Sequence, residues 1–203
     1  DAITKLKKLE LIGEYEKPED FEYKIQVTVN PNEKTITFTD NGLGMTEEEV
    51  DEYINQIAFS GAQDFLNKYK DKANEDQIIG HFGLGFYSAF MVADKVTIDS
   101  RSYKKDAKPV HWESEGGTEF EMGEVTREEQ GTTIVLYLNE DSTEFSNEYR
   151  AREVIEKYCG FMPVPIFLDN AAEGPQYETI EKDQLTDKDT IIETIVEEAK
   201  TEE

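Results

Sequence analysis

The sequence contains few of the residues that form covalent or metal cross-links. Its 203 residues include one cysteine, Cys159, and two histidines, His81 and His111. A lone cysteine excludes an intrachain disulfide and fits a reducing compartment. These three residues are also too few for an ordinary structural zinc site. We therefore expect a cytoplasmic protein whose fold depends on its apolar core.

Positive charge is also scarce. Lysine and arginine number 21 against 46 aspartates and glutamates, which gives a formal net charge of −25. Such a field repels nucleic acid and anionic membranes, because binding either requires cations that neutralise phosphates. A nucleotide remains a possible ligand, provided that backbone N–H groups hold its phosphates.

Long apolar runs are absent. No stretch approaches the roughly 20 residues of a membrane span, and no signal-peptide pattern opens the sequence.

The length suits one domain with a core and a tail. Residues 170–203 hold 11 acidic residues and 3 lysines. We predict a folded domain over residues 1–169, followed by an acidic linker or tail over 170–203.

The apolar pattern predicts a mixture of helices and strands. Thr46 and Glu49 have capping-box spacing before a helix, and FYSAFMVA is apolar enough for a buried helix that starts near Phe86. Helices are also expected over 1–12 and 148–161, and strands over 23–30, 34–40, 95–102, 109–114, 118–125, 132–139 and 163–169. Without regular βαβ alternation, this order predicts an α+β two-layer sandwich.

The stretch GHFGLGF covers residues 80–86. Its glycine order is the reverse of the dinucleotide fingerprint, and it lacks the lysine of a P-loop. A glycine-rich turn before a helix exposes backbone N–H groups to which a phosphate can come close. The same turn also serves as a plain helix entry, and the stretch alone does not decide between the two interpretations.

A second glycine-rich stretch, DNGLGMT, covers residues 40–46. Asp40 ends a strand, and Asn-Gly is a common turn dipeptide, so an ordinary strand exit is one interpretation. In the other, the Asp40 carboxylate accepts a hydrogen bond from the exocyclic amine of a base. Gly42 and Gly44 then let the base lie against the backbone, with Met45 as an apolar wall.

Together with Gly131-Thr132 at the start of a strand, the two stretches resemble the Bergerat ATP-binding fold. That superfamily includes type II topoisomerase subunits, MutL mismatch-repair proteins, histidine kinases and heat-shock protein 90 chaperones. The strings QIAFSGAQDF, IGHFGLGFYSAFMVADKV and YCGFMPVPIF resemble the N-terminal domain of the bacterial heat-shock protein 90 chaperones, over about residues 1–169. The resemblance implies a mixed, mostly antiparallel sheet with helices on one face.

The resemblance also implies roles for individual residues. Asp40 receives the adenine amino group, Gly44 and Met45 line the base, and Thr132 supports the same hydrogen bonds. Residues 80–86 wrap the phosphates, and residues 60–79 match a lid that closes over ATP. The full set of implied nucleotide-binding residues is Asp1, Lys5, Asp40, Gly42, Gly44, Met45, Gly80, His81, Phe82, Gly83, Leu84, Gly85, Phe86 and Thr132.

The residues that carry hydrolysis in the family have no counterpart in this sequence. The resemblance places a general-base Glu and a Mg²⁺-binding Asn a few residues before Asp1, and an assisting arginine in a later domain. Glu47, Glu48 and Glu49 read as the solvated first turn of a helix. We therefore assign no catalytic residue and no metal ligand to this chain. His81 and Phe59 also depart from the family pattern, in which many members have Gln and Lys.

Two functions remain open. The first is the ATP/ADP-binding domain of a stress-response chaperone, in which Mg²⁺-nucleotide closes the lid and controls client folding within a homodimer. The second is a Bergerat-fold interaction module that binds partners without hydrolysis. The flanking strings favour the chaperone branch over histidine kinases and MutL proteins.

Overall fold

The computed structural model describes residues 1–55, 85–116 and 119–172 of the chain. By its contacts the chain divides into two units, Asp1–Ala172 and Glu173–Glu203. The second unit, which contains most of the predicted tail, lies outside the described residues.

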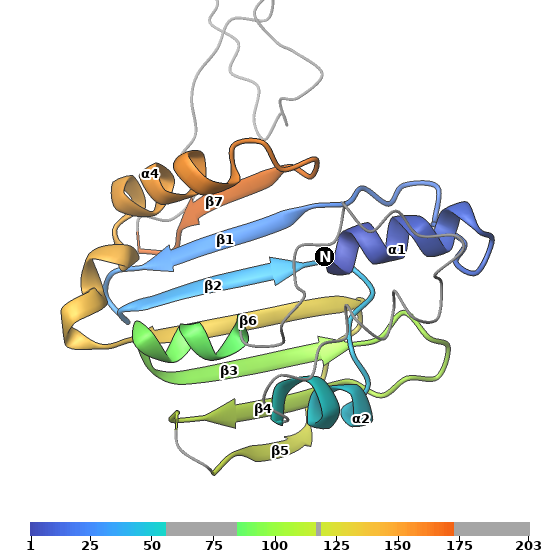
Figure 1. The fold of residues 1–203 in the computed structure, drawn as a ribbon, viewed down its shortest axis with the longest axis horizontal. Coiled ribbons are helices and arrows are strands. Elements are labelled where there is room, and N and C mark those ends of the chain that lie inside the picture. The colour runs from blue at the N-terminus through green and yellow to red at the C-terminus, as the bar shows by residue number, and fades with distance from the viewer. Residues whose placement is uncertain (56–84, 117–118, 173–203) are drawn as a thin grey trace, which may run out of the picture. The chain divides into compact units, whose positions relative to one another are not determined.

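Within the described residues of the first unit, seven strands form one sheet (Figure 1). Their order across the sheet is β5-β4-β3-β6-β2-β1-β7. Among these strands the β1–β7 pair is parallel, and the other five pairs are antiparallel. The bounds are β1 Ile25–Asn30, β2 Thr35–Asp40, β3 Ala93–Arg101, β4 Val110–Ser114, β5 Glu121–Glu124, β6 Gly131–Leu138 and β7 Ile166–Asn170. The mixed, mostly antiparallel sheet with helices confirms the predicted α+β class.

The hairpin of β1 and β2 shows how the sequence sets the register. Val27 pairs with Phe38 and Val29 with Ile36, so the apolar residues of both strands share one face. Because side chains alternate along a strand, the intervening threonines point to the opposite face. The predicted strands therefore form with their apolar residues toward the core.

The helices cover the apolar face of this sheet. The core includes Val50 from α2 and Ala151 from α4, packed with sheet residues such as Val27 and Leu136. In Figure 1, α2 and the 3-10 helix Phe86–Met91 (green) lie on the viewer's side of the strands. The helices within the described residues are α1 Ala2–Leu11, α2 Glu47–Val50 with a π-helical turn Asp51–Asn55, 3-10 helices Phe86–Met91 and Glu140–Ser146, and α4 Glu148–Cys159.

A second, smaller apolar cluster joins α1 to two loops. Leu6 and Leu9 of α1 are buried against Leu43 and Tyr103, which come from the loops after β2 and β3. The helix ends where the sequence predicts, because Gly13 follows with a φ of +77°. This cluster fixes α1 next to the end of β2.

The expected buried helix after Gly85 was wrong in two respects. The segment Phe86–Met91 is a 3-10 helix of six residues, and none of its residues is fully buried. The apolar run FYSAFMVA is longer than the helix, because its last residue, Ala93, already belongs to the sheet and pairs with Leu138. Phe86 packs edge-on against Trp112 at 5.4 Å between ring centroids, at the margin of the core.

None of the helices within residues 1–55, 85–116 and 119–172 combines the length and the apolar character that crossing a membrane requires.

Candidate nucleotide site at the end of strand β2

Three polar residues lie side by side at one end of the sheet. Asp40 of β2 pairs with Thr132 of β6, and Thr132 pairs with Ser100 of β3. Directly paired residues share a face, so all three project to the side that carries the core. Ser100 and Thr132 are buried, at 0% and 6% exposure. The fold thus places a carboxyl group and two hydroxyl groups in one row.

The loop from Asn41 to Thr46 is held at nearly every position. The N–H of Gly42 donates to Asp40 Oδ1 at 2.8 Å, and the carbonyl of Leu43 accepts from the N–H of Tyr103 at 2.8 Å. The N–H of Met45 donates to Ser100 Oγ at 2.9 Å. These bonds satisfy backbone groups that no strand or helix serves. These bonds hold the loop beside Asp40.

Two glycines permit this close packing. Gly44 has a φ of +61°, and a Cβ there would lie 1.9 Å from the carbonyl oxygen of Arg101. Gly131 has a φ of +115°, and its Cβ would lie 2.0 Å from the carbonyl oxygen of Asp40. Both positions therefore require a residue without a side chain.

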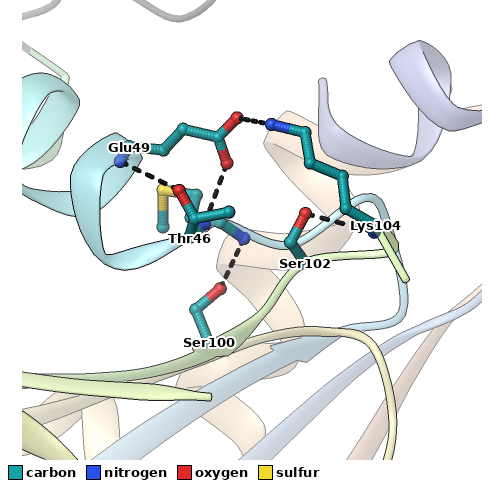
Figure 2. A network of polar contacts seen from close by, with 6 residues as sticks. Thr46, Glu49, Ser100, Ser102 and Lys104 are labelled. Carbon is teal, nitrogen blue, oxygen red and sulfur yellow. Dashed lines mark hydrogen bonds and ion pairs between the residues drawn. The ribbon is translucent and has the colours of Figure 1, made fainter. Parts of the chain in front are cut away.

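The loop leads directly into a capped helix, which Figure 2 shows. Thr46 Oγ1 accepts from the N–H of Glu49 at 3.3 Å, and Glu49 Oε2 accepts from the N–H of Thr46 at 2.8 Å. This confirms the predicted capping box. The other oxygen of Glu49, Oε1, lies 2.6 Å from Lys104 Nζ, so the cap is also tied to the loop after β3.

Burial raises the pKa of Asp40 above its usual 3.8. The N–H of Gly42, the positive charge of the amino terminus and that of Arg127 partly oppose the rise. A carboxylate in such surroundings gains from an additional hydrogen-bond donor, because water solvates it incompletely. A ligand amine is a donor of that kind.

Asp40 also lines a cavity of about 130 Å³. The other walls come from the first turn of α1, from β1 and from the segment before β7. The lining residues are Asp1, Ala2, Ile3, Thr4, Ile25, Asp40, Met162, Pro163 and Val164. Most of these side chains are apolar, so the cavity combines apolar walls with a carboxylate, as ligand sites commonly do.

The structure brings together some of the predicted site residues and not others. Asp1 and Asp40 share the cavity, while Gly42, Gly44, Met45 and Thr132 surround Asp40 through the loop and the sheet. Lys5 lies one turn along α1, with its N–H donating to the Asp1 carbonyl at 2.8 Å.

The phosphate-side residues are described only in part. Gly85 and Phe86 lie at the start of the 3-10 helix, outside the cavity lining. Gly80, His81, Phe82, Gly83 and Leu84 lie outside the described residues, as does the expected lid over 60–79. Within the described residues, no group of three or more His, Cys, Asp or Glu side chains is arranged to hold a metal ion.

The sequence analysis missed several residues of this region. Ser100 lies in an alternating strand, where a serine reads as solvent-facing, and only the sheet register places it beside Thr132. Ile25 and Met162–Val164 carry no pattern that links them to Asp40. Glu49 was predicted as part of the capping box, but its contact with Lys104 was not, because Lys104 is distant in the sequence.

Comparison with known proteins supports a nucleotide site. The family of histidine kinase-, DNA gyrase B- and HSP90-like ATPases matches residues 22–141, which include all of strands β1 to β6. Asp40, the loop after it and Thr132 all lie within the matched part.

The chain is also similar to several bacterial chaperones named HtpG. It is 49% identical to that of Bacteroides thetaiotaomicron over 190 residues, which cover 92% of this chain and 27% of the relative. The protein of Porphyromonas gingivalis is 44% identical over 190 residues, which again cover 92% of this chain and 27% of the relative. That of Shewanella frigidimarina is 39% identical over 186 residues, covering 89% of this chain and 29% of the relative.

The chain thus spans a little over a quarter of the length of these relatives. The family match covers more than half of the chain, and it includes the strands and the loop that surround Asp40. The chain therefore belongs to the family of histidine kinase-, DNA gyrase B- and HSP90-like ATPases, and its similarity to HtpG confirms the resemblance to the heat-shock protein 90 chaperones.

Proposed function

We propose that this chain binds ADP and ATP through the Asp40 site and serves as the nucleotide-controlled domain of a cytoplasmic chaperone. The carrying observation is the row of Asp40, Thr132 and Ser100 beside a fixed, glycine-containing loop. The family match and the similarity to HtpG support an adenine nucleotide as the ligand.

The chemistry of the row suits an adenine base. The Asp40 carboxylate is partly buried, and its pKa is raised by burial, so a donated hydrogen bond from an exocyclic amine stabilises its ionised form. The Gly44–Met45 backbone is held by the bond of the Met45 N–H to Ser100, and the Met45 side chain can adapt to an apolar ring. Because the loop is already bonded, binding costs little loop ordering.

The remaining parts of the proposal follow from the family. The stretch at 80–86 holds the phosphates, residues 60–79 close over them, and closure controls the folding of client proteins by a dimer of the longer protein. Mg²⁺ neutralises phosphate charge when the nucleotide is bound. We assign no Mg²⁺ ligand and no catalytic residue within this chain.

Isothermal titration of the 203-residue chain with Mg-ADP tests the binding site directly. The wild-type chain is expected to bind one Mg-ADP per chain. Asp40→Asn replaces one carboxylate oxygen, a hydrogen-bond acceptor, with an amide NH2 group of similar size, which is a donor. The variant is therefore expected to weaken Mg-ADP binding at least about tenfold.

A matched control is Asp94→Asn, since Asp94 is an exposed carboxylate on β3 with no role in the row. This variant removes the same charge and is expected to bind Mg-ADP like the wild-type chain. Equal binding by Asp40→Asn and Asp94→Asn would contradict the proposed site. If neither the wild-type chain nor the control binds Mg-ADP, the proposed nucleotide function of this chain is overturned.

A further inference from the structure

We propose that Ser100 is a positioning residue for the adenine base: its one hydroxyl group fixes both the Met45 backbone and the Thr132 hydroxyl. This inference rests on the proposed nucleotide function, which it extends to a residue on a third strand. Ser100 lies on β3 itself, whereas both glycine-rich stretches lie between the end of β2 and the start of β3 in the sequence.

The Ser100 hydroxyl has three polar neighbours and no contact with solvent. The N–H of Met45 donates to Ser100 Oγ at 2.9 Å. Thr132 Oγ1 lies 2.9 Å from Ser100 Oγ, and the carbonyl oxygen of Gly131 lies 3.2 Å from it. The side chain is fully buried, at 0% exposure. Each bond is therefore made with protein groups alone.

Counting protons shows that the three bonds depend on one another. The N–H of Met45 can only donate, so it occupies one acceptor position of Ser100 Oγ. The single Ser100 proton then goes either to the Gly131 carbonyl or to Thr132 Oγ1. In the first case Thr132 donates to Ser100, and in the second the Thr132 proton is available for a ligand or a water molecule. Ser100 thus sets the direction of the Thr132 hydroxyl.

The two groups that Ser100 holds both belong to the proposed base site, one to the loop after β2 and one to β6. Met45 belongs to the fixed loop that offers the wall for the ring, and Thr132 is the direct cross-strand neighbour of Asp40. A loss of Ser100 leaves the Met45 N–H without its partner and the Thr132 hydroxyl without its orientation. The effect on a nucleotide is therefore expected to fall on the base rather than on the sugar and phosphates.

Two diphosphates separate a positioning role from a merely structural one. Inosine diphosphate has the ribose and phosphates of ADP but carries a carbonyl group where adenine has its amino group. General loosening of the domain lowers the affinity for both ligands equally. Misplacement of the base site lowers the affinity for ADP more, and it reduces the preference for ADP over inosine diphosphate.

The experiment measures the dissociation constants of Mg-ADP and Mg-inosine diphosphate by isothermal titration for four chains. These are the wild type, Ser100→Ala, Ser100→Thr and Ser102→Ala. Ser100→Thr keeps the hydroxyl group. Ser102→Ala is the matched control, because Ser102 is also buried, at 3% exposure, and among the described residues its hydroxyl accepts from the N–H of Lys104 at 3.4 Å rather than from a group of the row.

We expect Ser100→Ala to weaken Mg-ADP binding about tenfold, the size of one lost hydrogen bond, and to bring the preference for ADP toward one. Ser100→Thr and Ser102→Ala are expected to keep the wild-type preference. An equal loss for both ligands in Ser100→Ala, or no loss, overturns the inference while wild-type binding still supports the proposed function. A wild-type chain that binds neither ligand overturns both.

Discussion

The backbone of Gly131 passes so close to Asp40 that no other residue fits there. A Cβ at Gly131 would lie 2.0 Å from the Asp40 carbonyl oxygen and 2.8 Å from the Asn41 Cα. The two residues open β6 and end β2, so this contact closes the sheet at the proposed base site.

Gly131→Ala is expected to destabilise the chain strongly, because the new methyl group collides with backbone at a φ of +115°. Strain and displacement together predict a loss of more than about 2 kcal/mol in the free energy of unfolding. Gly85→Ala is the matched control, since its Cβ meets nothing within 4 Å. Urea unfolding of both variants checks the prediction, and equal midpoints would contradict it.

Thr46→Ala is expected to lower the free energy of unfolding by about 1 kcal/mol, because Thr46 Oγ1 caps the first turn of α2. Thr143→Ala makes the same change in the 3-10 helix Glu140–Ser146, where the hydroxyl donates to the Glu140 carbonyl at 3.3 Å and does not cap the helix. The urea midpoint should fall for Thr46→Ala and stay nearly unchanged for Thr143→Ala. A similar fall in both variants would show that the capping hydroxyl of Thr46 contributes no more to stability than the hydroxyl of Thr143.

Much of the local structure could be predicted from the sequence. The alternation on both sides of PNEK predicts the β1–β2 hairpin, and the spacing of Thr46 and Glu49 predicts the cap, because both depend on near neighbours. The extent of the 3-10 helix after Gly85 could not be predicted, since pairing of Ala93 with a distant strand limits it. For the same reason the role of Ser100 is visible only in the sheet register.

The ion pair of Glu49 and Lys104 is expected to contribute little to stability. The atoms Oε1 and Nζ lie 2.6 Å apart, but about half of the Lys104 side chain is exposed to solvent. Exposed pairs are typically worth less than about 1 kcal/mol. A double-mutant cycle of Glu49→Gln and Lys104→Met should therefore give a coupling below that value. Lys105→Met, combined with Glu49→Gln in the same way, is the control. A coupling of several kcal/mol between Glu49 and Lys104 would contradict the expected small contribution of this ion pair.

Stability is expected to depend on pH through His111. Its Nδ1 lies 2.5 Å from Asp99 Oδ1, and its Nε2 lies 3.3 Å from Glu113 Oε2, which also contacts Lys95. The hydrogen bond to Asp99, helped by the one to Glu113 and opposed by burial, raises the pKa of His111 above 6.5. The folded state therefore binds the proton more tightly than the unfolded state.

The sign of this dependence follows directly. The contribution of His111 is fully present below pH 6.5, the unfolded value, and it is lost as the pH rises through the folded pKa. Wild type and His111→Gln are compared by urea unfolding at pH 6 and pH 9. The advantage of the wild type should be larger at the lower pH. A difference that stays constant between the two values would disprove the linkage.

The central claim is that Asp40 belongs to an adenine nucleotide site, and thermal unfolding with and without Mg-ADP tests it most directly. A ligand at 100 times its dissociation constant stabilises by about 2.7 kcal/mol, which corresponds to a rise of roughly 5 to 11 °C in a domain of this size. Asp40→Asn, which is expected to weaken binding at least about tenfold, should cut that rise to about half or less. It should not lower the midpoint of the free chain, because it removes a carboxylate whose pKa burial raises. The account predicts a clearly larger rise for the wild type than for the variant, and an equal rise in both, or none in the wild type, would contradict it.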